Sequence, residues 1–235
     1  MTPPAAGGER MLDCLVSAAS MLVAWFCVGL ELLLLVGLIA RGRVRHSYLL
    51  FLLVLTWLAS SLVAGLSPAT MTWDAWIVTE LGHALLAFLL AFELVLRAFR
   101  PVPRAWWWAR LALGITLLAA ITLVGFAWPG PISVSVIPWL LGALACLYVA
   151  LWGLAGAMGM PQEPLHQAVL VGLSPYLIVY AVTWGQVGDD TTLANAINPL
   201  MFVLSLAVLS RAAWAREPIL AGHPETVRWL FPWRF

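Results

Sequence analysis

The chain contains no lysine, because all 12 of its basic side chains are arginines. A mechanism that needs a lysine amine, such as a retinal or pyridoxal Schiff base, is therefore excluded. Charge of either sign is scarce, since charged residues make up 10% of the 235 residues, against roughly 25% in an ordinary soluble protein. The formal net charge of +1 gives no reason to expect a nucleic-acid partner.

Cysteine is also scarce. The three cysteines, Cys14, Cys27 and Cys146, are odd in number and far apart. They form no Cys-x-x-Cys motif and no disulfide framework. We interpret them as small packing residues within apolar segments.

Hydrophobic residues, in contrast, make up 63% of the chain, and the mean hydropathy is +0.96. A helix needs about 20 apolar residues to cross a bilayer. Seven runs reach that length, at 14–40, 47–66, 75–97, 106–127, 137–158, 166–186 and 193–211. Met1–Arg10 lacks the features of a cleaved signal peptide, so the first run is expected to be retained. The sequence predicts an all-α, polytopic seven-helix bundle over residues 1–212.

The arginines predict the orientation of this bundle. Eleven of them fall on one side of the predicted spans, in the odd-numbered loops and after the seventh run, and only Arg10 falls on the other side. Arginine-rich loops stay in the cytoplasm. We therefore expect the N-terminus outside and the C-terminus inside, in the inner membrane of a bacterium.

Tryptophans fit the same assignment. Trp106, Trp107 and Trp108 lie at a predicted inner end, where indole rings favour the headgroup zone. The last segment, 213–235, mixes tryptophan, phenylalanine and arginine, which predicts a cytoplasmic interfacial tail. A disordered end is the alternative.

Polar side chains within three of the runs predict a binding site. Ionisable groups inside a membrane are costly, so each one is a candidate functional residue. Those of the third, sixth and seventh runs share one depth in the outer half, and together with aromatic neighbours they suit a small-molecule pocket: Glu80, His83, Tyr176, Tyr180, Thr183, Gln186, Asn195 and Asn198. Ser60 and Ser61 are further candidates. The competing interpretation is structural, with Glu80 facing headgroups and the asparagines joining helices.

Three further charges lie deeper or nearer the inner end. Glu93 and Arg97 are spaced i,i+4 with the acid first, which favours an ion pair on one helix. Glu31 is roughly 15 Å from the inner end of its run at 1.5 Å rise per residue. It is either protonated or paired across helices, with Arg97 or a hydroxyl as the partner.

Two prolines interrupt the runs that carry the predicted pocket. Pro175 and Pro199 each remove one backbone hydrogen bond, so both are expected to bend their helices. Static kinks and moving hinges are both consistent with this pattern.

Catalytic and metal-binding patterns are missing. Of four histidines, only His83 lies within a run, so no pair at matching depth can hold a b-type haem. Glu80-x-x-His83 is a single copy of a motif that di-iron bundles use twice. No metal site is predicted, the cofactor stays open, and catalysis is disfavoured.

The third run and its exit, from Trp76 through Glu80, Glu93, Arg97 and Arg100 to Pro103, resemble the seven-helix membrane modules of bacterial signalling proteins and their stand-alone relatives. The resemblance implies a sensory protein. The chain ends at Phe235 without an output domain, so signalling would need a separate cytoplasmic partner.

We therefore expect a receptor-like or sensory membrane protein that binds a small apolar or amphipathic ligand in its outer half, in contact with membrane lipid. An accessory subunit of a larger membrane complex, holding a lipid, quinone or pigment, is the alternative. A small transporter is the third hypothesis.

Overall fold

The structure is a computed structural model that describes residues 6–67, 72–127, 136–160, 163–185 and 191–215. Helices account for almost all of the described chain, and no strand occurs in it. The helices are α1 (Ala6–Ala40), α2 (Tyr48–Leu66), α3 (Trp73–Leu94), α4 (Pro103–Ala127), α5 (Val136–Ala157), α6 (Pro164–Gly185) and α7 (Thr191–Trp214).

All seven helices are long and apolar enough to cross a membrane. This finding confirms the all-helical fold and the number of predicted spans. The helices extend beyond several predicted boundaries: α4 begins at Pro103 rather than at 106, and α7 continues to Trp214. The predicted interfacial tail lies outside the described residues from 216 onward.

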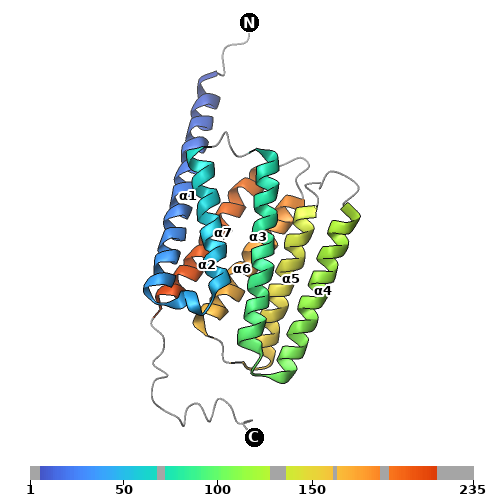
Figure 1. Cartoon of the computed structure of the whole chain (residues 1–235). Coiled ribbons are helices and arrows are strands. Elements are labelled where there is room, and N and C mark those ends of the chain that lie inside the picture. Colours follow the sequence, from blue (N-terminus) through green and yellow to red (C-terminus); the bar gives the residue numbers. More distant parts are fainter. Residues whose placement is uncertain (1–5, 68–71, 128–135, 161–162, 186–190, 216–235) are drawn as a thin grey trace.

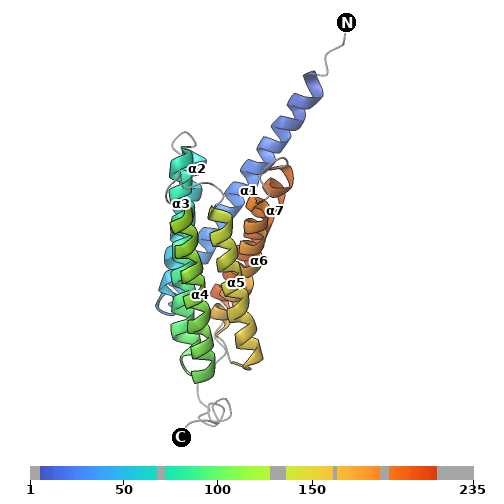
Figure 2. The ribbon, with the colours of Figure 1, turned by 90° about the vertical axis from the view of Figure 1, so that its right-hand side faces the viewer.

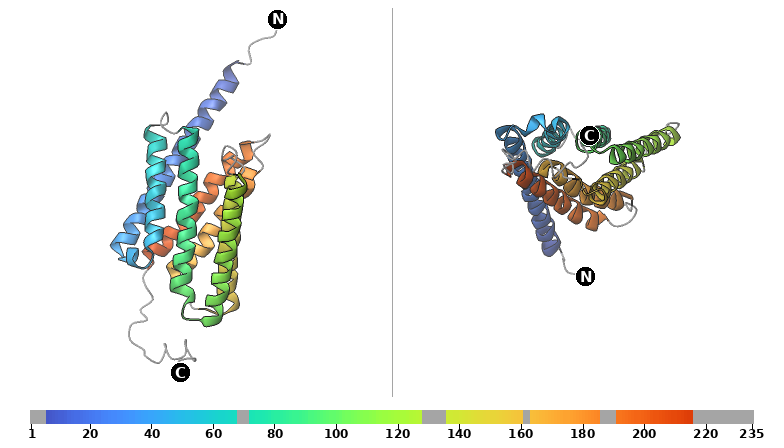
Figure 3. Two further views of the ribbon diagram at one scale, coloured as in Figure 1. Left: turned by 45° about the vertical axis from the view of Figure 1, so that its right-hand side comes forward. Right: turned by 90° about the horizontal axis from the view of Figure 1, so that it is seen from below.

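The bundle has two layers, one formed by α2, α3 and α4 and the other by α5, α6 and α7 (Figure 2). Neighbouring helices within a layer are also neighbours in sequence, as short connections require. Helix α1 packs against both α2 and α7 and so joins the layers at one end. At the other end, α5 packs against both α3 and α4. The view along the bundle shows this arrangement (Figure 3).

The N-terminal part of α1 projects beyond the other helices (Figure 1). We call the end of the bundle on that side the N-face, and the end where α1 stops and α7 finishes the C-face. Helix α1 ends at the C-face because Gly42 adopts a left-handed conformation, with φ at 63°, which only glycine adopts without strain. A short 3₁₀ turn, η1 (Arg43–Arg45), then leads into α2.

Small residues set the contact between the layers. Ala84, Ala87 and Ala91 of α3 are buried, and they let α5 approach closely. Tyr148 of α5 is fully buried there, and its hydroxyl donates a hydrogen bond of 2.8 Å to the carbonyl of Ala87. A buried tyrosine hydroxyl needs such a partner, so this bond fixes α5 against α3.

Large apolar side chains cover the outside of the bundle, as a surface facing lipid requires. Helix α4 is the most exposed, with 17% of its apolar window buried against 44% for α5 and α6. The exposed side chains of α4 include Ile115, Leu118 and Ile121. Helix α4 therefore flanks the bundle and contributes little to its interior.

Pro175 and Pro199 lie inside α6 and α7, which continue through them. The hydroxyl of Ser174 donates to the carbonyl of Leu170 one turn earlier. This bond holds the turn that precedes Pro175. Whether either helix bends or moves in function stays a prediction.

Candidate functional site

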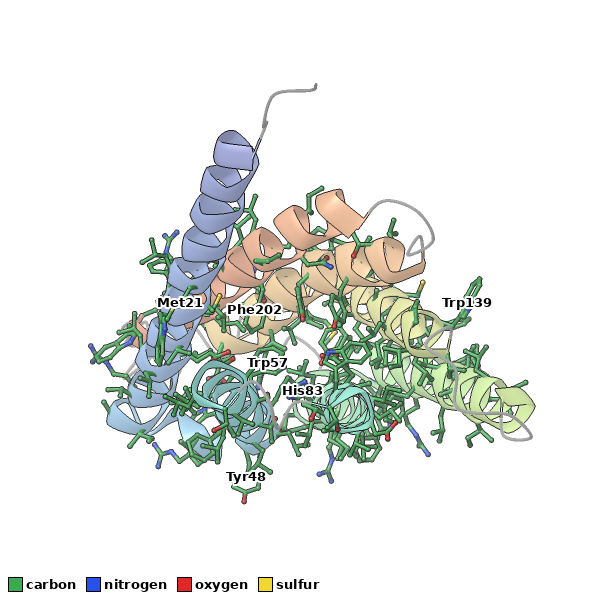
Figure 4. All side chains as sticks on the ribbon, turned by 90° about the horizontal axis from the view of Figure 1, so that it is seen from above. Met21, Tyr48, Trp57, His83, Trp139 and Phe202 are labelled. Carbon is green, nitrogen blue, oxygen red and sulfur yellow. The ribbon has the colours of Figure 1, made fainter. Side chains whose placement is uncertain are left out.

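Trp57 of α2 stands at the centre of the site. Its ring is 7% exposed and contacts three other rings edge-on, with centroid separations of 6.3 Å to His83, 6.3 Å to Tyr176 and 5.1 Å to Phe202. These partners come from α3, α6 and α7, so one side chain connects four helices. Figure 4 shows Trp57, His83 and Phe202 pointing into the space between the two layers.

His83 joins α3 to α2. Its Nε2 lies 3.3 Å from the Ser60 hydroxyl oxygen, and its ring is also hydrogen-bonded to the backbone of Thr56. A histidine inside a membrane helix needs such polar partners because no water replaces them. The sequence placed His83 and Ser60 at one level, and the structure brings them into contact.

Glu80 joins α3 to α6. Its carboxyl group is hydrogen-bonded to the side chain of Tyr180. Tyr180 in turn stacks on Tyr176, one helical turn away, with centroids 5.6 Å apart and planes inclined by 24°. Glu80 therefore turns into the bundle rather than toward headgroups. Its part in ligand binding stays a prediction.

Thr183 and Asn198 join α6 to α7. The Thr183 hydroxyl lies 2.8 Å from Asn198 Oδ1, and also within 2.8 Å of the Val179 carbonyl of its own helix. Asn198 precedes Pro199, so this contact lies at the proline position of α7. The contact is the helix-joining role that the structural interpretation assigns to asparagine.

Glu31 of α1 reaches the same region from the opposite side. Its side chain is fully buried, and its Oε1 accepts a hydrogen bond of 3.1 Å from the Ser61 hydroxyl. Tyr176 lies within electrostatic range of Glu31, Cys27 and Glu80. The partner of Glu31 is thus a hydroxyl, one of the two kinds of partner that the sequence suggested, and not Arg97.

These residues form one group, which we call the interior cluster. It contains Glu31, Trp57, Ser60, Ser61, Glu80, His83, Tyr176, Tyr180, Thr183, Asn198 and Phe202. Six of the eight predicted pocket residues belong to it. Gln186 lies outside the described residues, as does the side chain of Asn195.

The helices that carry the cluster do not all pack against one another. Helix α3 packs mainly on α2 and α5, while α6 packs on α5 and α7. A pocket between helices three, six and seven would be simplest if all three adjoined. Of these, α6 packs on α7, and α3 reaches α6 through the side chains of Glu80 and Tyr180. Sequence reasoning missed Trp57 and Phe202. Their position deep within a span, away from the headgroup zone that tryptophan prefers, was the available signal.

At the C-face, Glu93 and Arg97 form an ion pair of 2.8 Å. Glu93 is buried, and its two carboxylate oxygens also accept from the backbone amides of Tyr48 and Leu49, at 3.2 and 3.0 Å. These amides belong to the first turn of α2, where unpaired N–H groups attract negative charge. Arg97 lies in a π-helical turn, η3 (Val95–Phe99), and its Nη1 donates to the carbonyl of Arg45 at 2.7 Å.

Arg43 does not behave as the surface charge that its loop position indicates. Its side chain is 1% exposed, and it donates to the carbonyls of Ala212 and Ala215, at 2.9 and 2.7 Å. The Ala212 carbonyl lies in the last turn of α7, and the Ala215 carbonyl follows directly after the helix. Carbonyls at the end of a helix need such partners from outside it. A loop arginine next to two others gives no signal of this role in the sequence.

A second polar group at the C-face holds two histidines. His46 Nδ1 and His166 Nδ1 lie 3.2 and 3.7 Å from the carboxylate oxygens of Glu163. Within the described ranges, no group of three or more His, Cys, Asp or Glu side chains could hold a metal ion. We therefore interpret this contact as a link between the α1–α2 turn and the start of α6.

The interior cluster combines polar side chains with aromatic rings. It offers hydrogen-bond donors and acceptors next to aromatic rings, and small-molecule sites have this composition. Comparisons with models of protein families, with curated proteins and with solved structures find no match for this chain.

Proposed function

We propose that this protein is a receptor-like or sensory integral membrane protein that binds a small apolar or amphipathic ligand at the interior cluster. One observation carries the proposal: side chains of α2, α3, α6 and α7 converge on Trp57 with polar partners beside it. A purely structural core would be filled by apolar side chains, as the contact of α1 with α2 and α7 is at Leu34, Leu53 and Leu206. The cluster instead retains groups that are costly in a membrane.

The N-face is outside in this proposal, and the C-face lies in the cytoplasm of a bacterial cell. The arginines of the C-face support this orientation, since nearly all of them are exposed: Arg41, Arg45, Arg97, Arg100, Arg104, Arg110 and Arg211. A ligand would then enter from the outer half of the membrane. Signalling would pass to a separate cytoplasmic partner through the C-face.

Helix α7 provides a route for that signal. Near the N-face it carries Asn198 and Phe202 of the interior cluster, and at the C-face its last turn is held by Arg43. A ligand that binds one arrangement of Thr183 and Asn198 more tightly shifts the helix toward that arrangement. Such a shift would change the hydrogen bonds of Arg43 to Ala212 and Ala215 at the C-face.

Ligand-dependent thermal stabilisation tests this proposal. Purified protein in detergent is heated with fractions of bacterial lipid extract, and the midpoint of unfolding is compared with that of Thr183→Val. Fractions that raise the midpoint of the wild type should have at most a weak effect on this variant. No fraction raising the midpoint of the wild type would contradict the proposal.

Thr122→Val is the matched control. Like Thr183, Thr122 donates to a carbonyl one turn earlier in its own helix, at 2.8 Å, but it lies exposed on α4. Its variant loses the same hydroxyl without touching the interior cluster. Stabilisation by the active fraction should therefore be unchanged in Thr122→Val.

An accessory subunit of a larger membrane complex is the second candidate, and α4 favours it. Trp107 and Trp108 of this helix are 59% and 51% exposed and contact each other edge-on, with centroids 5.0 Å apart. Exposed aromatic side chains are common at protein interfaces. Purification from native membranes without detergent exchange decides between the candidates, because fixed partners at constant stoichiometry support the subunit and a monomer contradicts it.

A further inference from the structure

Glu31 is the most deeply buried acid of the described chain, with no exposed surface. Its Oε1 is bonded to Ser61, and its Oε2 is buried without a hydrogen-bond partner. No cationic side chain of the described residues pairs with it: Arg97 pairs with Glu93, and Arg43 is bonded to α7. An ionised carboxylate left alone in an apolar interior is very costly.

The surroundings of Glu31 differ between the two faces. Toward the C-face, it is followed by tightly packed leucines of α1, α2 and α7, all of them fully buried: Leu34, Leu38, Leu50, Leu53, Leu206 and Leu209. The buried polar side chains of α7 in this half are Ser205 and Ser210, which carry no charge. Among the described residues, this half therefore offers no path of ionisable groups from Glu31 to the C-face.

Toward the N-face, exchangeable groups follow one another. Ser61 bonds to Glu31, and its neighbour Ser60 lies 3.3 Å from His83 Nε2. Glu80 is one helical turn beyond His83 and is bonded to Tyr180. The contacts of Ser61 with Glu31 and of Ser60 with His83 are direct, and the remaining steps join polar side chains of the same helix.

We propose that Glu31 is a proton-binding site that exchanges with the N-face through Ser61, Ser60, His83 and Glu80, and not with the C-face. In this reaction a hydronium ion of the N-face medium transfers its proton to the Glu31 carboxylate, leaving water and a neutral carboxylic acid. The proposal concerns protons alone and goes beyond the binding of a small molecule. The proton site does not depend on the interior cluster binding a small molecule.

The chemistry of the site favours a proton over a metal ion. One carboxyl group and one hydroxyl are too few ligands for magnesium or calcium, which take six or more oxygens. The described residues hold no cluster of metal-binding side chains. Sodium would also be attracted to a carboxylate, so its competition is an outcome of the test.

The groups that face Glu31 are few, so its titration can be followed with little interference. Cys27 lies one turn away on α1, Ser61 faces it from α2, and Tyr176 of α6 is within electrostatic range. The titratable groups of α3 nearest to it along the path are Glu80 and His83. Helix α7 contributes no ionisable side chain between Ile197 and Leu209.

Labelling with dicyclohexylcarbodiimide tests the proton site, because this apolar reagent modifies carboxyl groups in their protonated form. Purified protein in lipid nanodiscs is labelled at a series of pH values without sodium, and peptides are quantified by mass spectrometry. Labelling of Glu31 should fall by about tenfold for each pH unit above the midpoint of its titration. Glu93 is the internal control, since it is also buried but is balanced by Arg97, and it should stay unlabelled.

Three results would overturn the proton site. Absent labelling of Glu31 would show a carboxylate that binds no proton in the accessible range. Labelling that stays constant between about pH 4 and about pH 10 would show a carboxyl group that releases none, and so does not exchange protons. Suppression of labelling by sodium chloride but not by choline chloride at constant pH would identify a sodium site instead. Glu31→Gln should remove the labelled peptide and so confirms its assignment.

Membrane vesicles test the sidedness. The pH inside is fixed, the pH of the medium is varied, and a tag before Met1 reports which face is outward. Labelling of Glu31 should follow the medium in vesicles that expose the N-face and ignore it in vesicles that expose the C-face. The reverse pattern, or a response in both, would contradict the path.

Discussion

The guanidinium group of Arg43 donates a hydrogen bond of 2.9 Å to the carbonyl of Ala212, 169 positions later in the chain. It closes the bundle at the C-face, because the turn after α1 thereby holds the end of α7. The bond to Ala215 adds a second contact to the same turn. A buried cation that satisfies two terminal carbonyls also balances the negative end of the α7 dipole.

Replacement of this arginine should destabilise the whole bundle. Arg43→Met removes both hydrogen bonds and leaves the carbonyls of Ala212 and Ala215 without this partner, at a cost of about 2–4 kcal/mol. Arg45→Met is the matched control, since the Arg45 side chain is exposed. Thermal unfolding in detergent should show a lower midpoint for Arg43→Met alone. Equal midpoints for the two variants would contradict the role of Arg43.

Gly37 should be needed for the contact between α1 and α7. A methyl group at this position would lie 2.7 Å from Nε1 of Trp214, which itself donates to the Leu33 carbonyl at 3.0 Å. Gly37→Ala must therefore displace the indole, at about 1–3 kcal/mol.

The control is Gly29→Ala on the same helix, where a methyl group meets nothing within 4 Å. This change should be neutral or stabilise the helix by up to about 1 kcal/mol. The unfolding midpoint of Gly37→Ala should fall below that of the wild type, and the midpoint of Gly29→Ala should stay equal to it or rise. A Gly37→Ala variant as stable as Gly29→Ala would show that Trp214 does not pack as described.

Glu93 should matter more than Arg97, although the two form one ion pair. Glu93→Gln removes the charge that accepts from the first amides of α2 and leaves Arg97 unpaired, so we expect a loss of about 2–4 kcal/mol. The Arg97 side chain is 41% exposed, and Arg97→Met should cost only about 1 kcal/mol after solvent screening. Unfolding of both single variants and the double variant measures the coupling. A larger loss for Arg97→Met would contradict this order.

Tyr148→Phe tests the bond that fixes α5 against α3. The hydroxyl is lost, the Ala87 carbonyl loses this donor, and the cost should be about 1 kcal/mol. Tyr48→Phe is the control because the Tyr48 ring is 54% exposed at the start of α2. Its midpoint of unfolding should match that of the wild type. Identical midpoints for both variants would remove the argument for a structural role of the Tyr148 hydroxyl.

Hydropathy alone predicted the seven helices, because a bilayer leaves a long apolar segment few alternatives to a helix. Depth counting then placed Glu80, His83, Tyr180 and Asn198 at one level, and these residues do belong to one cluster. Depth is readable from sequence because each residue adds a fixed rise along the helix.

The rotation of each helix about its axis, and the helices that it packs against, could not be predicted in the same way. The contact of α5 with α3 could not be predicted, since Tyr148 and the alanines it packs against lie far apart in the chain and form no sequence motif. Trp57 was missed because its importance comes from four helices that meet only in the folded chain. The buried role of Arg43 could not be predicted for the same reason, because its partners are 169 and 172 positions away.

The central claim is that the interior cluster binds a small molecule between Trp57, His83 and Asn198. A high-resolution cryo-electron microscopy map of the protein, extracted with its native lipids and without detergent exchange, tests it most directly. We predict non-protein density in contact with His83 and Asn198, and loss of this density in Asn198→Leu. A map in which the side chains of the cluster pack directly against one another, with no such density, would contradict the account.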